Sequence, residues 1–212
     1  MSTDYPDEPW RLAGEAFVSV WVVPRRALPR VTDTVTPLTI GGRAVVVTAW
    51  IDYTPPGQLS YHELLATVAV RPERRAGAHL AAGSITEIWV DDEASRAGGR
   101  ELWGIPKDLA TFEFDRFDGF TASASTREEW IATATFTPRG PAGPFVPAAF
   151  SIAQSISGRS LVSPVRARVR ARFATAVWTV NPNGPLSYLA GRRPLINAHL
   201  RDARLLFGRH RR

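Results

Sequence analysis

The sequence predicts one domain of the all-β to α+β class, an antiparallel β-rich barrel or sandwich with one or two short helices. Many short runs alternate between apolar and polar residues or are rich in β-branched residues, as half-buried strands are. Turn residues separate these runs at short intervals, which is typical of antiparallel sheets. The chain has 212 residues, 44% of them hydrophobic and 22% charged, so it is large enough to bury a substantial core.

The expected strands follow one another along the chain. In order they are Ala16–Val23, Ala44–Tyr53, Leu64–Val70, Ile85–Val90, Thr111–Phe114, Phe120–Ser125, Trp130–Phe136, Val165–Val180 and Asn197–Phe207. Clusters of glycine, proline and asparagine are expected to form turns between them, at Gly41-Gly42, Pro55–Gly57, Gly98-Gly99, Asp118-Gly119 and Asn181–Pro185. The Asp-Gly step at 118–119 lies between two phenylalanines and predicts a hairpin.

Two short helices are expected beside these strands. The Pro/Gly-rich segment Pro138–Pro147 predicts a loop, and Ala148–Ile156 after it predicts a helix whose apolar residues face the core. Pro106 suits the first position of a second helix. Lys107 would then lie in the first turn of that helix, where the positive end of the helix dipole disfavours a cation.

Both ends of the chain are expected to lie outside the folded domain. Residues 1–9 predict a disordered tail, residues 10–207 the domain, and residues 208–212 a basic tail. No signal peptide is visible at the start, and no apolar run approaches the ~18–20 residues of a membrane span. The expected location is therefore the cytoplasm, with no membrane partner.

Composition excludes several kinds of chemistry. The chain has no cysteine, so disulfides, thiolate nucleophiles and thiolate metal sites are absent. The histidines lack metal-ligand spacing, and no glycine-rich phosphate loop or Gly-x-Ser-x-Gly motif occurs. The net charge of +6 raises nucleic acid as a partner, but the arginines are spread along the chain, and those from Arg166 to Arg172 alternate with apolar residues like the solvated face of a strand. We expect no metal, no cofactor and no nucleic-acid partner.

Lys107 is the one lysine among the 26 lysine and arginine residues. Arginine serves as well as lysine for surface charge, but a guanidinium, with a pKa above ~12, is not a nucleophile in proteins. A lysine that persists among so many arginines is therefore a candidate for a reaction that needs a primary amine, and the most obvious one is attack on a carbonyl to form a Schiff base. The alternative is that one lysine escaped replacement by chance.

The residues around Lys107 favour the first interpretation. The apolar stretch Leu102–Pro106 precedes it, and burial among apolar groups disfavours a charged ammonium. Asp108 follows directly, and a carboxylate facing the amine would hold the proton on it. We therefore expect the side chain of Asp108 to turn away from the pocket.

The run GRELWGIPKDL, residues 99–109, resembles the active-site segment of the acetoacetate decarboxylase family, which reads Gly-Arg-Glu-Leu, a few residues, then Pro-Lys-Lys-Leu. This resemblance implies that Lys107 is the Schiff-base lysine. Acetoacetate decarboxylase is also the standard example of a lysine activated by a second cationic group, but here Asp108 stands where the family has its second lysine. Residues 57–65 resemble a second family segment that ends in Tyr-x-Glu, which implies that Glu63 lies in the pocket and acts on the substrate.

The resemblance runs from about Trp10 to Leu109, and the spacing from the strand Ile85–Asp91 to the lysine matches the family without a gap. Two positions depart from the family pattern. A second pocket glutamate of the family falls at or near Thr48, and a substrate-holding arginine falls close to Gly14, where the nearest arginine is Arg11. These departures weaken acetoacetate as the substrate without weakening imine chemistry. The pocket residues implied by the resemblance and the motifs are Tyr61, Trp103, Ile105, Thr48 and Arg11.

The function expected from this resemblance is that of a lyase. Lys107 forms a Schiff base with a keto acid, a β-keto acid loses carbon dioxide, and Glu63 positions the substrate or transfers a proton. One alternative is an aldolase, dehydratase or cyclase that acts on an α-keto acid through the same imine. A second is a catalytically inactive ligand-binding member of the fold. The resemblance also implies a homo-oligomer with a small keto acid as its partner.

Overall fold

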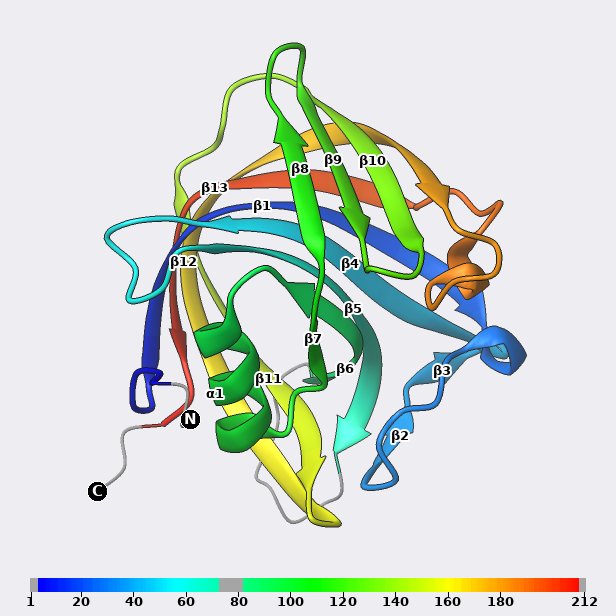
Figure 1. Ribbon diagram of the computed structural model, residues 1–212. Coiled ribbons are helices and arrows are strands. Elements are labelled where there is room, and N and C mark those ends of the chain that lie inside the picture. Colours follow the sequence, from blue (N-terminus) through cyan, green and yellow to red (C-terminus); the bar gives the residue numbers. More distant parts are fainter. Residues whose placement is uncertain (1–3, 73–81, 210–212) are drawn as a thin grey trace.

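The computed structural model describes residues 4–72 and 82–209 (Figure 1). Its strands are β1 (Trp10–Pro24), β2 (Val35–Pro37), β3 (Thr39–Ile40), β4 (Arg43–Tyr53), β5 (Tyr61–Pro72), β6 (Ala82–Val90), β7 (Lys107–Leu109), β8 (Thr111–Asp115), β9 (Phe120–Ser125), β10 (Trp130–Pro138), β11 (Phe145–Ile156), β12 (Arg159–Val180) and β13 (Ile196–Phe207). The helix α1 spans Glu93–Trp103, and short 3-10 turns occur at Arg25–Ala27 and Ser187–Leu189. The predicted β-rich class is confirmed, and every predicted strand lies within an observed one.

Seven strands pair in a closed ring. The order is β11-β6-β5-β4-β1-β13-β12, and β11 also pairs with β12, which closes the path. All of these pairs are antiparallel except β11 with β6. Of the two architectures expected, the pairing therefore favours the barrel for this part of the chain.

The long strand β12 belongs to two parts of the fold. Its first half pairs with β11, and its second half pairs with β10, which continues into β9 and β8. Figure 1 shows β8, β9 and β10 folded across the outside of the ring, over β1 and β4. The turn at Asp118-Gly119 joins β8 to β9, so the predicted hairpin is confirmed.

Two hydrophobic cores follow from the alternation of strand side chains. One core lies between the outer face of the ring and β8–β10, where Phe17 of β1 stacks on Phe120 of β9 with 3.7 Å between ring centroids. The other lies inside the ring and includes Trp10, Trp103 and Ile105. The inner core surrounds the cavity described below.

The predicted helix at Ala148–Ile156 is wrong, because this segment is the second half of β11. It pairs residue by residue with β12, from Ala148 opposite Ala167 to Ile156 opposite Arg159. A short apolar run fits a strand and a buried helix equally well, and only the partner strand decides between them. The predicted loop at Pro138–Pro147 is correspondingly shorter, since β10 includes Pro138 and β11 begins at Phe145.

The predicted helix start at Pro106 is also wrong, because α1 ends before it and Lys107 begins strand β7. Asp92 caps the helix start by accepting a hydrogen bond from the backbone of Ser95, and Gly104 ends it with a left-handed conformation. Gly98 and Gly99, predicted as a turn, lie inside α1. Their low helix propensity is outweighed by packing, because a Cβ on Gly98 would lie 2.5 Å from the ring of Trp10.

The described part of the predicted disordered tail, residues 4–9, is packed against α1. The Tyr5 hydroxyl donates a hydrogen bond to Glu101 at 2.7 Å, and Trp103 donates to Glu8 at 3.2 Å. The prediction failed here because Trp10 and Trp103 make an apolar surface that these residues cover. Residues 1–3 of that tail, and residues 210–212 of the predicted basic tail, lie outside the described residues.

Candidate active site

A cavity of about 450 Å³ lies inside the ring. Residues of all seven ring strands line it, and on β5 they alternate strictly as Tyr61, Glu63, Leu65, Thr67 and Ala69. The end of α1, the connection after it and the start of β7 add Trp103, Ile105 and Lys107 to the wall. The size is within the range of small-molecule sites.

Strand β7 brings Lys107 to this wall. It pairs in parallel with β6, where Lys107 lies opposite Ile88. The stem of the lysine packs across Gly99 of α1, because a Cβ there would lie 2.7 Å from the Cδ of Lys107. Only 4% of Lys107 is exposed to solvent. Glycine at position 99 is therefore what lets the lysine pass between helix and strand into the cavity.

The amine of Lys107 has three hydrogen-bond acceptors. Its Nζ lies 2.8 Å from a carboxylate oxygen of Glu63, 2.8 Å from the hydroxyl of Ser95 and 3.2 Å from the hydroxyl of Tyr61. An ammonium has three protons to donate, so each has an acceptor here. Glu63 is 3% exposed, which makes this a buried ion pair.

Two tyrosines complete the surroundings of Glu63. The hydroxyls of Tyr61 and Tyr53 lie 3.4 and 3.5 Å from its carboxylate oxygens. Burial raises the pKa of both tyrosines well above the ordinary value, and the negative charge of Glu63 raises it further. Both phenols therefore keep their protons and can act as hydrogen-bond donors to the carboxylate.

This arrangement differs from the one expected for activation by burial alone. The amine of Lys107 is not isolated among apolar groups but is paired with the buried carboxylate of Glu63. The two groups are at hydrogen-bonding distance, so a proton can pass from the ammonium to the carboxylate and leave a neutral pair. Such a transfer yields a nucleophilic amine and a carboxylic acid in one step.

The other predicted site residues divide into two groups. Tyr61, Trp103 and Ile105 line the cavity. The pocket positions predicted for Thr48 and Arg11 are wrong. Thr48 points into the outer core, where its hydroxyl accepts a hydrogen bond from Trp21 at 2.9 Å, while its neighbours on β4 face the cavity. Arg11 is exposed on the outside of β1, because only the alternate residues Trp10 and Leu12 point inward.

The predicted orientation of Asp108 is confirmed. Its side chain is 65% exposed and lies 3.7 Å from Arg100 on the outer surface. Among the described residues that line the cavity, Lys107 is the one lysine or arginine. The amine of Lys107 therefore has no second lysine or arginine beside it among the described residues of the cavity wall.

Sequence reasoning missed Ser95 and Tyr53. Ser95 is fully buried in the first turn of α1, and Tyr53 ends β4 directly opposite Tyr61 of β5. The cap at Asp92 was a signal for the helix, but no motif marks a serine three residues later as a partner of the lysine. Tyr53 reaches Glu63 through the pairing of β4 with β5, and Ser95 reaches Lys107 through the position of α1 beside β7. Local sequence patterns reveal neither arrangement.

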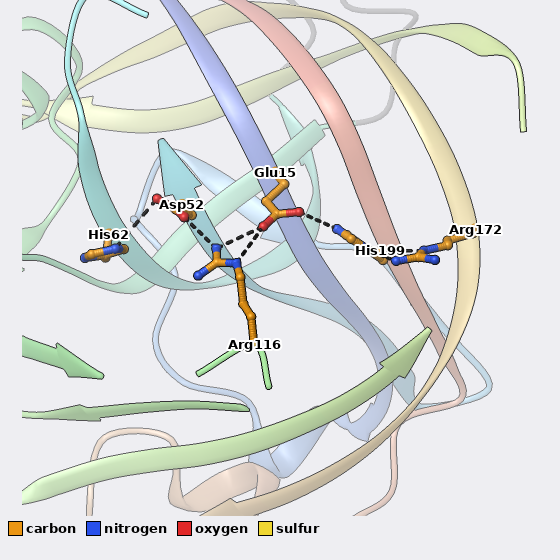
Figure 2. Close-up of polar contacts among 6 residues, drawn as sticks. All are labelled: Glu15, Asp52, His62, Arg116, Arg172 and His199. Atoms are coloured by element: carbon orange, nitrogen blue, oxygen red, sulfur yellow. Dashed lines mark hydrogen bonds and ion pairs between the residues drawn. The ribbon is translucent and has the colours of Figure 1, made fainter. Parts of the chain in front are cut away.

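A second ionic cluster lies on the outer face of the ring (Figure 2). Glu15 of β1 accepts hydrogen bonds from Arg116 at 2.9 and 3.1 Å and contacts Nε2 of His199 at 2.6 Å. Arg116 also pairs with Asp52, which lies 3.6 Å from His62. Arg172 has only donors, so Nδ1 of His199 accepts from it and Nε2 carries the proton toward Glu15.

In residues 4–72 and 82–209, no group of three or more histidine, aspartate or glutamate side chains is arranged to hold a metal ion. None of the helices there has the length and apolar character needed to cross a membrane.

Comparison with known proteins links the chain to one family. The family model described as "Acetoacetate decarboxylase (ADC)" matches residues 1–183. A protein named acetoacetate decarboxylase 3, from Mesorhizobium japonicum, is 41% identical over 63 residues. That match covers 30% of this chain and 20% of the relative, so it spans about a fifth of the relative's length.

Solved structures show the same fold. The acetoacetate decarboxylase of Legionella pneumophila superposes with a TM-score of 0.69 at 20% identity, over 98% of this chain and 88% of that one. The enduracididine biosynthesis enzyme MppR complexed with pyruvate superposes with a TM-score of 0.63 at 17% identity, over 97% and 89%. At these identities the likeness is one of fold.

Proposed function

We propose that this protein, which belongs to the acetoacetate decarboxylase family, is a lyase that decarboxylates a β-keto acid through a Schiff base on Lys107. One observation carries the proposal. The single lysine of the chain is buried at the wall of a closed-ring cavity, 2.8 Å from the carboxylate of Glu63. A nucleophile beside a buried acid–base group is the arrangement that imine catalysis needs.

The first half of the reaction forms the imine. Glu63 accepts a proton from the ammonium of Lys107, and the neutral amine attacks the ketone carbon of the substrate. Glu63 then returns the proton to the resulting hydroxyl, which leaves as water and gives a protonated imine between Lys107 and the substrate. Ser95 and Tyr61, which contact Nζ, orient the amine for this attack.

The second half breaks the carbon–carbon bond. The bond to the carboxylate cleaves, carbon dioxide leaves, and its electron pair moves into the protonated imine to give a neutral enamine. The enamine carbon takes up a proton that Glu63 relays from solvent. Water then hydrolyses the imine, which releases the ketone and restores the ammonium of Lys107. One proton is consumed for each carbon dioxide released.

The surroundings of Lys107 favour decarboxylation over aldol chemistry on an α-keto acid. An α-keto acid keeps its carboxylate through aldol condensation, so its site needs a lasting cationic partner for that group. The described wall of the cavity has no cation besides Lys107 itself, which the imine uses. A carboxylate that leaves as carbon dioxide has no such need, and the apolar wall destabilises it before it leaves.

Parallel product analysis tests the proposal. Purified protein is incubated with 3-oxobutanoate and 3-oxohexanoate while carbon dioxide is measured, and separately with pyruvate and an aldehyde while condensation products are measured by mass spectrometry. We expect carbon dioxide release that the Lys107→Arg variant lacks. Condensation without carbon dioxide would favour the aldolase alternative. No product in either assay would favour a ligand-binding protein.

A further inference from the structure

The cavity extends well beyond the groups that the reaction uses. On β5 it reaches from Glu63 to Ala69, six residues or about 20 Å of strand. Away from Lys107, its described wall is almost entirely apolar and includes Val18, Val47, Leu65, Val169 and Leu200. Glu15 also borders it, but its carboxylate is bound to Arg116 and His199 on the outer face.

Small side chains keep this part of the ring hollow. Gly14, Ala16, Ala49, Ala69 and Ala167 all line the cavity, at inward positions where larger residues would fill a ring of this size. A substrate of four carbon atoms would leave most of an apolar cavity of about 450 Å³ unfilled. Most of the aliphatic wall would then make no van der Waals contact with the substrate. A hollow lined by aliphatic groups is suited to an aliphatic chain.

The two ends of the cavity differ in their exposure to solvent. Lys107, at one end, is buried against α1, whereas Ala148 of β11 lines the cavity and is exposed. Strand β11 runs parallel to β6, with Ile152 opposite Gly83, so Ala148 lies beyond the level of Gly83 and its partner Ala69. Among the residues that the structure describes, the open end of the cavity therefore lies at the opposite end from the amine.

We propose that the natural substrate is a keto acid with an unbranched apolar chain, whose carbonyl lies at Lys107 and whose chain runs along the ring toward Ala148. This rests on the proposed function for the identity of the reacting group. The chain itself is recognised by the aliphatic wall alone. Each methylene added to the substrate chain is buried until the chain reaches the open end of the cavity. Further methylenes then add no binding affinity.

Binding of 2-alkanones tests the chain separately from the chemistry. These ketones correspond to the products and carry no carboxylate, and their affinity is measured by titration calorimetry for acetone, 2-heptanone, 2-nonanone, 2-undecanone and 2-tridecanone. We expect the affinity to rise about fourfold for each methylene, the equivalent of ~0.8 kcal/mol, and then to level off. An affinity that is flat or falls with chain length would overturn the proposal.

Turnover in the same series distinguishes the two proposals. If affinity rises with chain length but no β-keto acid from 3-oxobutanoate to 3-oxododecanoate releases carbon dioxide, the proposed reaction is wrong. The proposal that the ligand has an apolar chain is then still supported. If carbon dioxide is released but kcat/KM is highest for 3-oxobutanoate, the reaction stands and the chain proposal fails. The expected result is a kcat/KM that rises with chain length.

Substitutions inside and outside the ring locate the chain. Ala69→Phe fills the far end of the cavity and is expected to reduce the gain in affinity between 2-nonanone and 2-tridecanone. Val47→Thr adds a hydroxyl with little change in volume and is expected to reduce the gain, which keeps the test valid if the phenylalanine variant does not fold. Ala149→Phe is the matched control, since Ala149 is exposed next to Ala148 and does not line the cavity. Equal slopes in all three variants would overturn the proposal.

Discussion

The inner and outer ionic clusters lie on opposite faces of the same strands. Glu63 and His62 are neighbours on β5, yet Glu63 points to Lys107 inside the ring and His62 to Asp52 outside it. The inner cluster borders a cavity and contains the one lysine of the chain. The outer cluster is built from arginines, histidines and carboxylates that bind one another, and it holds the β8–β9 turn against the ring through Arg116.

This contrast separates the charged groups that are available for chemistry from those that are bound to one another. Arg116 cannot become a nucleophile, and its guanidinium is shared between Glu15 and Asp52. Lys107 can lose its proton to Glu63, and a substrate carbonyl has space beside it. Changes to the inner cluster should therefore alter catalysis, and changes to the outer cluster should alter stability.

Replacing the amine should have the largest effect. Lys107→Arg keeps the charge beside Glu63 but removes the nucleophile, so we expect a loss of about 10⁴-fold or more in kcat with the fold retained. Steady-state kinetics and far-UV circular dichroism measure the two effects. A variant with near wild-type turnover would exclude imine catalysis.

Glu63→Gln should have the next largest effect on the reaction. The amide cannot accept the proton of the ammonium, and loss of a general acid–base group lowers rates by about 10²- to 10⁴-fold. The matched control is Glu15→Gln, which removes a carboxylate of the outer cluster from the neighbouring region of the ring. Equal kcat losses in the two variants would show that the clusters do not differ as we describe.

The stability of the outer cluster should depend on pH through Glu15. Burial alone raises the pKa of this carboxyl, but hydrogen bonds from His199 and Arg116 and the charge of Arg116 outweigh it and lower the pKa to about 2. A lowered pKa stabilises the fold above the ordinary value of 4.5, and that contribution is lost as the pH falls from there toward 2. Because Glu15 and Arg116 are partly exposed, solvent screening reduces this contribution at neutral pH to about 1–2 kcal/mol.

Chemical denaturation of wild type and Glu15→Gln across this pH range checks the prediction. The difference in unfolding free energy between them should be full at neutral pH and shrink as the pH falls below about 4.5. A difference that stays constant down to the lowest pH would mean that the ionised carboxylate of Glu15 does not stabilise the fold.

Asp108→Asn should have the smallest effect. Its exposed carboxylate faces Arg100 and not Lys107, and exposed ion pairs contribute at most ~1 kcal/mol. We expect less than a twofold change in kcat and no displacement of the pH–rate profile. A shift of the profile by a pH unit would place Asp108 in contact with the amine during the reaction.

The sequence was most informative where function restricts residue type. Lys107 and Glu63 were predicted from the lysine count and two short motifs, and the structure brings them within 2.8 Å. Each predicted strand was confirmed because alternation is a local pattern, whereas β11 was predicted as a loop followed by a helix. Tyr53 was missed and Thr48 was misplaced because facing the cavity depends on strand register, where a shift of one residue reverses the side of the sheet. Ser95 was missed because its contact with Lys107 depends on how α1 packs beside β7. The helix α1 was missed because Gly98 and Gly99 have low helix propensity and were predicted to form a turn. Their close packing against Trp10 and Lys107 outweighs that propensity, and a local sequence pattern does not reveal it.

Reductive trapping of the imine tests the central claim most directly. The protein is treated with borohydride in the presence of a β-keto acid, and the adduct is located by peptide mass spectrometry. We predict one adduct, on Lys107, with the mass of the decarboxylated ketone after reduction, and none at position 107 in Lys107→Arg. Turnover of the substrate without any adduct on Lys107 would contradict the account.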